Sequence, residues 1–238
     1  MIIGTLINVG AILAGSIVGV FLGGRLPERV KQTVISGIGL FVLVLGFQMF
    51  LKTQNSLYVL GGLIIGVILG EILRIEDGLQ NLGGFFERHF MKTQENQVSS
   101  ETSNFIRGFL TASLLFCIGP MAILGSIQDG LAANHELLIV KSILDGFSSL
   151  AFASSLGIGV LFSSLIVLVY QGSISLLAAQ FQTVFSNSMM NEMTAVGGLI
   201  LVGIAISSLL EIKKIRMGNF LPALVITPLL VALVALFG

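Results

Sequence analysis

The longest apolar stretch of the chain, residues 137–181, constrains the fold more than any other part of the sequence. Between Ser142 and Phe181 the only side chain of the Asp, Glu, Lys, Arg or His type is Asp145. This segment is about twice as long as the ~20 residues that a helix needs to cross a bilayer. It is therefore expected to form two membrane-spanning helices joined by a tight turn near Leu156–Gly159.

The composition of the whole chain supports the same class of protein. Of 238 residues, 55% are hydrophobic and only 10% are charged, whereas soluble domains carry about 25% charged residues. The long continuous apolar runs do not show the alternation of a membrane β-barrel. The chain is therefore expected to be an all-α, polytopic transmembrane helical bundle in a lipid bilayer. Its zero net charge gives no indication of nucleic-acid binding.

The sequence offers little for catalysis or metal binding. Cys117 is the only cysteine, and the two histidines, His89 and His135, are far apart in the chain. The chain lacks a zinc-protease motif, a nucleophile elbow and a phosphate-binding loop. The sequence therefore predicts no metal site, no cofactor and no enzyme.

About eight spans can be drawn, and the basic residues between them predict the orientation. Arginine and lysine are concentrated in the first, third and seventh connections, and they prefer the cytoplasmic side. Both termini are therefore expected outside the cell. The expected spans are residues 2–23, 32–51, 57–73, 105–127, 137–156, 158–181, 194–211 and 219–238.

Small residues recur at four-residue spacing in two of these spans. Gly15 and Gly19 share one helix face in the first span, and Gly62, Gly66 and Gly70 share one in the third. Such a face, often called a glycine zipper, lets another backbone approach closely. The face could pack within the chain, form the seam of a homodimer, or line a pore.

Two sequence comparisons within the chain suggest a duplication inside a single transmembrane domain, residues 1–238. Residues 61–75 resemble 197–212, and residues 104–115 resemble 219–230. The halves would be residues 1–127 and 137–238, two parallel four-helix repeats. Asn8 then aligns with Asp145. Residues 77–103 are expected to form a cytoplasmic surface helix and a linker.

Asp145 is the first candidate for a binding site. A carboxylate that faces lipid is costly, so Asp145 should face other helices or a water-filled cavity. It could bind a cation or proton, with oxygen ligands supplied by the residues around it. These candidate ligands are Asn8, Ser148, Ser149 and the carbonyls freed at the break expected at Gly119-Pro120.

A structural alternative accounts for the same residue. Lys141 lies four residues before Asp145, and this spacing permits an ion pair on one helix face.

Asp129, His135 and Glu136 follow the expected break at Gly119-Pro120 and are expected to lie in a solvated outer loop.

Several stretches of the chain are long and specific enough to indicate a family. They are IIGTLINVGAILAGSIVGVFLGGRLPERVK, GGLIIGVILGEIL, GPMAILGSIQDGL, LIVKSILDGFSSLAFASSLGIGV, MTAVGGLILVGIAI and KIRMGNFLPALVITPL. These stretches resemble the YqgA/YdfK-like family of bacterial inner-membrane proteins, known as domain of unknown function 554. The resemblance covers nearly the whole chain. It implies a multi-pass protein of the bacterial plasma membrane, loosely described as a transporter, and supplies no established catalytic residues.

Two functions remain open on this reading. The leading hypothesis is a homodimeric transporter or channel for a small solute or ion, coupled to a cation or proton, with Asp145 at its centre. The rival is a non-transporting, homo-oligomeric membrane scaffold or assembly protein, built through the glycine faces. A polar cavity at Asp145 would favour transport, and a dry, fully packed interior would favour scaffolding.

Overall fold

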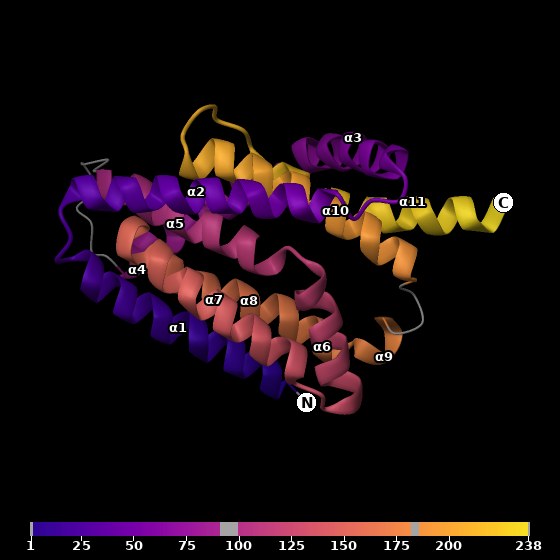
Figure 1. Cartoon of the computed structure of the whole chain (residues 1–238), viewed down its shortest axis with the longest axis horizontal. Helices are drawn as coiled ribbons and strands as arrows, with labels where there is room; N and C mark the ends of the chain where they lie inside the picture. The colour runs from indigo at the N-terminus through magenta and orange to yellow at the C-terminus, as the bar shows by residue number, and fades with distance from the viewer. Residues whose placement is uncertain (1, 91–99, 182–185, 238) are drawn as a thin grey trace. The chain divides into compact units, whose positions relative to one another are not determined.

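The computed structural model describes residues 2–90, 100–181 and 186–237, and the described residues are almost entirely helical (Figure 1). The helices are α1 (Ile3–Gly23), α2 (Glu28–Phe50), α3 (Ser56–Leu73), α4 (Ile75–Phe90), α5 (Ser100–Cys117), α6 (Pro120–Ala132), α7 (Glu136–Leu156), α8 (Gly159–Leu176), α9 (Ala178–Phe181), α10 (Asn187–Ile204), the π-helical turn η1 (Ala205–Leu209), the 3-10 turn η2 (Met217–Phe220) and α11 (Ala223–Phe237).

The predicted fold class, an all-α polytopic membrane protein, is confirmed. Among the described residues, seven helical segments are long and apolar enough to cross a bilayer. The pair formed by α5 and α6 passes the same test when taken together, although it is bent by 62°. The segments therefore number seven, or eight if the bent pair is one span, in agreement with the predicted total.

The chain divides into two compact units, which are described separately. The first unit comprises Met1–Gly37, Leu79–Cys117 and Met121–Phe181. The second comprises Ile38–Gly78, Ile118–Pro120 and Gln182–Gly238. Each unit draws segments from both halves of the chain, so the units do not coincide with the predicted repeat halves. The duplication itself stays a prediction.

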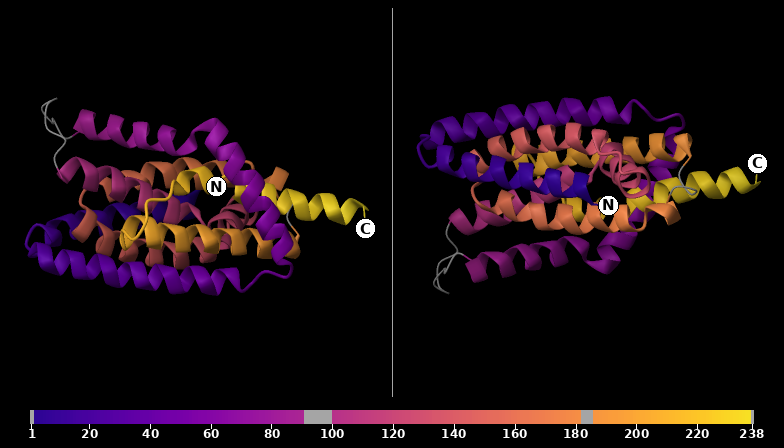
Figure 2. Two further views of the ribbon diagram at one scale, coloured as in Figure 1. Left: turned by 90° about the horizontal axis from the view of Figure 1, so that it is seen from above. Right: turned by 90° about the horizontal axis from the view of Figure 1, so that it is seen from below.

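In the first unit, α1 and α7 run side by side in the same direction along a seam of small residues (Figures 1 and 2). A methyl group added at Gly15 would lie 2.1 Å from the carbonyl oxygen of Gly146, and one at Gly19 would lie 2.4 Å from that of Leu150. Only glycine allows this separation of the two backbones. The glycine face of α1 is therefore occupied by a helix of the same chain.

The second unit contains an equivalent seam between α3 and α11, which run in opposite directions. Methyl groups added at Gly62, Gly66 and Gly70 would overlap Thr227, Ala223 and Asn219, respectively. Thus the five glycines predicted to mediate helix packing all lie against helices or turns of this chain. The homodimer that these faces suggested stays a prediction.

Glycines break the spans at two places in the chain. Gly119 has φ +127°, a conformation that side chains disfavour, and it separates α5 from α6. Pro120 follows as the first residue of α6, where a proline costs no hydrogen bond. Gly157, with φ +81°, ends α7 in the turn that was predicted between the fifth and sixth spans.

An aromatic cluster joins α4, α5 and α8 within the first unit. Phe105 and Phe109 of α5 are buried with Phe162 of α8, and Phe86 of α4 packs against this group. The Phe86 ring centroid lies 5.5 Å from that of Phe162. The predicted helix at the start of residues 77–103 corresponds to α4, and residues 91–99 lie outside the described residues. The location of α4 at the inner membrane surface stays a prediction.

The α1–α7 seam leads to a test of close packing. Gly15→Ala forces a methyl group against the Gly146 carbonyl and should destabilise the protein by roughly 1–3 kcal/mol. Gly10→Ala is the matched control, because a methyl group there meets nothing within 4 Å. Thermal unfolding of the purified full chain in detergent measures both. Equal Tm values for the two variants would contradict the seam.

Candidate functional site

Asp145 lies in the interior of the first unit, paired with Lys141 one turn earlier on α7. Asp145 is 7% exposed and Lys141 is 5% exposed. The ammonium of Lys141 donates to Oδ2 of the carboxylate. The structural alternative, an i,i+4 ion pair, is therefore present. The pair is buried and does not reach outward to the surface.

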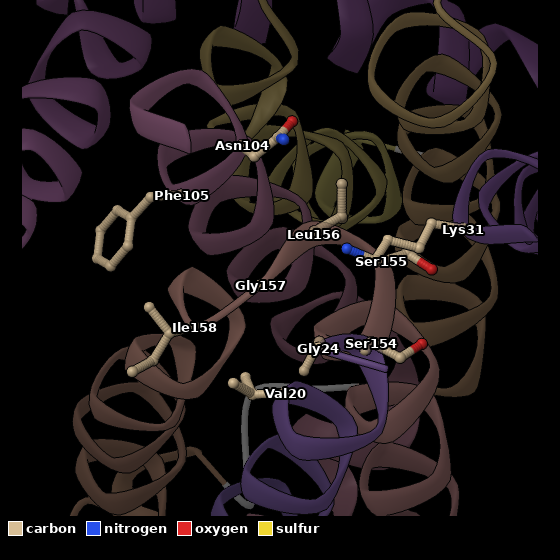
Figure 3. A pocket seen from close by; sticks show the side chains of 12 residues that line it. Val20, Gly24, Lys31, Asn104, Phe105, Ser154, Ser155, Leu156, Gly157 and Ile158 are labelled. Carbon is tan, nitrogen blue, oxygen red and sulfur yellow. The ribbon is translucent and has the colours of Figure 1, made fainter. Parts of the chain in front are cut away.

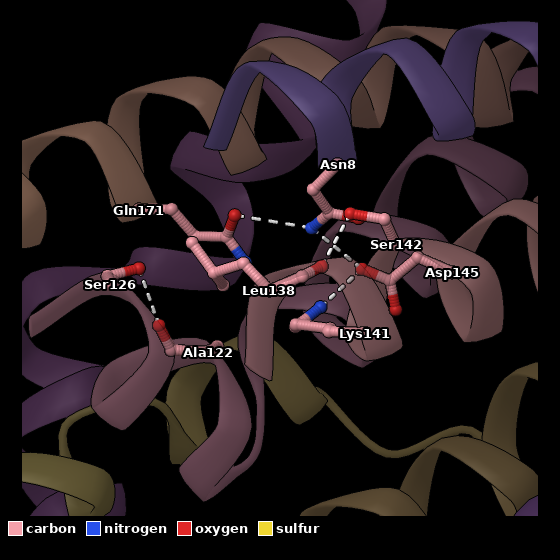
Figure 4. A network of polar contacts seen from close by, with 8 residues as sticks. All are labelled: Asn8, Ala122, Ser126, Leu138, Lys141, Ser142, Asp145 and Gln171. Carbon is pink, nitrogen blue, oxygen red and sulfur yellow. Dashed lines mark hydrogen bonds and ion pairs between the residues drawn. The ribbon is translucent and has the colours of Figure 1, made fainter. Parts of the chain in front are cut away.

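Two amide side chains from other helices complete the cluster (Figure 4). Asn8 of α1 donates through Nδ2 to Oδ2 of Asp145 at 3.0 Å and to Oε1 of Gln171 of α8 at 3.2 Å. Both amides are fully buried. The structure thus brings Asn8 and Asp145, aligned in the predicted repeat, into direct contact. Gln171 was not among the predicted site residues.

The cluster retains unused hydrogen-bonding capacity. Oδ1 of Asn8 and Nε2 of Gln171 are buried and have no hydrogen-bond partner among the described residues. Ten buried side-chain atoms of the described residues lack a partner, and these two belong to one cluster beside a carboxylate. The neighbouring ion pair is already expensive to bury. An acceptor and a donor therefore remain unpaired beside a carboxylate.

The predicted serine ligands contribute less directly. Ser149 donates to the carbonyl oxygen of Gly146 at 2.9 Å and to that of Ile12 at 3.2 Å, which ties α7 to α1. Ser142 donates to the carbonyl oxygen of Leu138. Ser148 is half-buried on α7, and its role as a ligand stays a prediction.

The predicted part of Gly119 and Pro120 in the site also remains a prediction. The break between α5 and α6 is present, as the sequence indicated. Both residues belong to the second compact unit, whereas Asp145, Lys141 and their partners belong to the first.

Asp129 was expected in a solvated loop, and this expectation was wrong. It lies within α6 and is fully buried. Its Oδ1 accepts from the backbone N–H of Gly4 at 3.2 Å and lies 2.5 Å from Nδ1 of His135. Oδ2 has no partner among the described residues. The Gly, Asn and Asp residues near Asp129 are typical of a loop, and the expectation was based on them. The sequence does not show where α6 ends.

Glu192 of α10, in the second unit, is another buried carboxylate that sequence reasoning missed. Its oxygens accept from Thr53 Oγ1 at 2.5 Å and from the backbone N–H groups of Gln54 and Asn55 at 2.7 and 3.0 Å. Three donors satisfy the carboxylate without a cation. Glu192 therefore anchors the turn between α2 and α3. Its position as a lone acid directly before an apolar run was the available signal.

The charged group paired with Asp145, the ammonium of Lys141, can move to a second partner. No group of three or more His, Cys, Asp or Glu residues in the described parts of the chain could hold a metal ion. Nζ of Lys141 lies 6.0 Å from the centroid of the Phe116 ring, a distance at which cation–π attraction begins. Lys141 thus has a second, weaker partner close to the carboxylate.

Comparison with known proteins places the chain among membrane proteins. The family model described as "Protein of unknown function (DUF554)" matches residues 3–232. "Uncharacterized protein YqgA" of Escherichia coli (strain K12) is 32% identical over 239 residues, covering 100% of both chains. "Uncharacterized membrane protein YdfK" of Bacillus subtilis (strain 168) is 30% identical over 239 residues, covering 99% of this chain and 98% of that protein. No solved structure matches the chain.

The ion pair can be tested by a double-mutant cycle. Lys141→Met leaves the buried carboxylate without its cation and should destabilise the protein by roughly 3–5 kcal/mol. Adding Asp145→Asn removes the second charge and should recover most of that loss. Tm values of the full chain in detergent, with both single variants and the double variant, give the coupling. Losses that simply add would show that the two side chains are independent.

Proposed function

Because the chain belongs to the DUF554 family of proteins of unknown function, we propose its function from the geometry of the site: it transports a small solute or ion across the membrane, coupled to a cation or proton. Asp145 is the central residue, and Asn8, Gln171 and Lys141 form the site with it. The proposal applies to a multi-pass membrane protein.

Two polar atoms that lack hydrogen-bond partners, beside a buried ion pair, give the proposal its main support. A purely structural cluster around the Lys141–Asp145 pair is expected to have its hydrogen bonds complete. Instead, Asn8 and Gln171 bring two amides into the interior and leave one acceptor and one donor without partners. Intramembrane ionisable residues that face the bundle interior commonly mark ion pathways. These unpaired atoms support transport. The cavity found in the first unit is not lined by Asp145 or its partners, so the predicted criterion of a polar cavity at Asp145 adds no support.

A polar series connects the cluster with the end of α1 that is predicted to lie outside. The His135 side chain is 23% exposed and contacts the buried Asp129, which accepts from Gly4. Asn8 follows Gly4 by four residues, about 6 Å along the helix axis. The hydroxyl of Thr5, between them, is buried with no partner among the described residues. A proton or small cation has polar groups along this part of α1.

The other half of the α1–α7 seam is closed. The backbones meet at Gly15 and Gly146, about two turns after Asn8 on α1 and directly after Asp145 on α7, and meet again at Gly19 and Leu150. Passage toward the predicted inner side therefore requires α1 and α7 to separate. In the proposed transport cycle, the present arrangement is closed toward the predicted inner side.

Transport requires Lys141 to leave the carboxylate. A proton or cation arriving at Asp145 competes with the ammonium of Lys141 for Oδ2, because both bind the same oxygen. Once displaced, the ammonium can approach the face of Phe116. Binding and a change of side-chain position are then coupled, which is the requirement for a ligand to shift a conformational equilibrium.

The scaffold hypothesis has lost the observation that suggested it. Its support was the glycine faces of the first and third spans, and both faces pack against helices or turns of the same chain. The homodimer, the absence of enzymatic activity and the location in a bacterial plasma membrane remain part of the proposal. Both termini are assigned to the outer side from the distribution of basic residues.

Transport is tested with the reconstituted full chain. Proteoliposomes loaded with the pH dye pyranine receive a Na⁺ or K⁺ gradient, and the wild-type protein should change the internal pH faster than protein-free liposomes. Asp145→Asn removes the charge that binds the cation and should slow this flux about tenfold or more, since each ~1.4 kcal/mol of lost binding is tenfold.

Asp77→Asn is the matched control, because it makes the same chemical change at an exposed position on α4. Its flux should equal that of the wild type. A wild-type rate equal to that of protein-free liposomes, or an Asp145→Asn rate equal to that of the wild type, would contradict the proposal.

Orientation is tested by labelling engineered cysteines in a Cys117→Ser background. Gln54 lies between α2 and α3 and Lys213 lies after η1, and both are exposed. Gln54→Cys should react with a membrane-impermeant maleimide in intact spheroplasts, whereas Lys213→Cys should react only after permeabilisation. The reverse pattern would place the termini inside.

A further inference from the structure

A cavity of about 300 Å³ lies in the first unit, away from Asp145, where α1 and α7 end and α8 begins (Figure 3). Its polar lining residues come from three helices: Lys31 from α2, Asn104 from α5, and Ser154 and Ser155 from α7. This end of α1 is the one predicted to lie at the inner membrane surface. The volume is at the lower end of the range for small-ligand pockets.

Lys31 is the only charged residue among the twelve that line the cavity. Its side chain is 24% exposed and lies 3.6 Å from the carboxylate of Glu28, which is 68% exposed. Such surface pairs are weak, so Glu28 competes little for the ammonium. The negative end of α7 and the positive end of α8 meet at Gly157, and their dipoles offset one another. The end of α1 adds a further set of carbonyl dipoles, and Lys31 is the only full charge in the lining.

Ser155 supplies a second, independent indication of a ligand. The residue is 9% exposed, lines the cavity, and its hydroxyl has no hydrogen-bond partner among the described residues. Ser154, by contrast, donates to the carbonyl oxygen of Ala151 at 2.8 Å. A hydroxyl buried without a partner carries a desolvation cost. A ligand oxygen accepting from Ser155 would remove that cost.

The remaining lining is apolar and includes Val20, Phe105, Leu156 and Ile158. A ligand that suits this cavity thus combines an anionic, oxygen-rich group with a short apolar part. Basic pockets between helices on the cytoplasmic side bind the headgroups of anionic lipids. A soluble phosphate ester offers the same chemistry.

We propose that this cavity binds a phosphate ester, either the headgroup of an anionic phospholipid or a small soluble phosphate, with Lys31 as its charge partner and Ser155 as its hydrogen-bond donor. The proposal does not depend on transport through Asp145. The charge of Lys31 attracts the phosphate, Ser155 orients one phosphate oxygen, and the apolar wall contacts the esterified group.

The test measures the Tm of the full chain in a zwitterionic detergent as ligand is added. The probes are dihexanoyl phosphatidylglycerol, dihexanoyl phosphatidylcholine and glycerol 3-phosphate. Phosphatidylglycerol should raise the Tm in a saturable manner, and phosphatidylcholine should not. Lys31→Ala and Ser155→Ala should each weaken half-saturation about tenfold, as expected for one charge-assisted hydrogen bond.

The matched control is Arg29→Ala, which removes the same charge from an exposed residue of α2 that does not line the cavity. It should leave half-saturation unchanged. Ser155→Ala should keep the Tm without ligand, because its hydroxyl has no partner to lose. An equal response to glycerol 3-phosphate would identify a soluble phosphate as the ligand, and a response to phosphatidylglycerol alone would identify a lipid.

Three results would overturn the proposal. The first is the absence of a saturable response to either phosphate probe. The second is an equal loss of affinity in Arg29→Ala and Lys31→Ala, which would indicate general surface electrostatics. The third is a Lys31→Ala variant with a lower Tm and an unchanged response to ligand, which would make Lys31 a structural partner of the α7 carbonyl groups.

Discussion

The first unit depends on one interaction, the buried ion pair between Lys141 and Asp145. Two charges at membrane depth are tolerated only when each has a partner in good geometry. Their placement one turn apart on α7 provides that partner locally, and Asn8 then ties the carboxylate to α1. The helices around this pair must therefore face it with polar groups. The cluster of Asn8, Gln171 and Asp145 is the direct result.

The glycine seam explains how α1 can reach the ion pair. Asn8 is a short side chain, and it contacts Asp145 only because the α1 and α7 backbones are nearly touching at Gly15 and Gly19. Hydrogen bonds from Asn8 to Asp145 and from Ser149 to the Ile12 carbonyl oxygen cross the same seam. The small residues thus position the polar cluster at the contact that the proposed transport cycle would have to open.

Two of the buried carboxylates, Glu192 and Asp145, differ in how complete the hydrogen bonding around them is. Glu192 has three donors from a single turn, and its environment is complete. Asp145 shares one oxygen between an ammonium and an amide, and that amide and its neighbour Gln171 have atoms without partners. Burial alone does not distinguish them. The completeness of the hydrogen bonding does, and it favours Asp145 as the site where a ligand acts.

The sequence by itself determined the class of fold, because apolar runs of about 20 residues have one stable solution in a bilayer. It also determined the breaks at Gly119 and Gly157, since glycine and proline act locally, and it singled out Asp145 and its partner Lys141. Gln171 could be recognised as a buried polar residue, but the sequence could not show its contact with Asn8, the burial of Asp129 or the cavity lined by Lys31 and Ser155. Those depend on which helix faces meet, and apolar helices carry too little pattern to specify their neighbours. Only the tertiary structure decided which polar side chains share an interior.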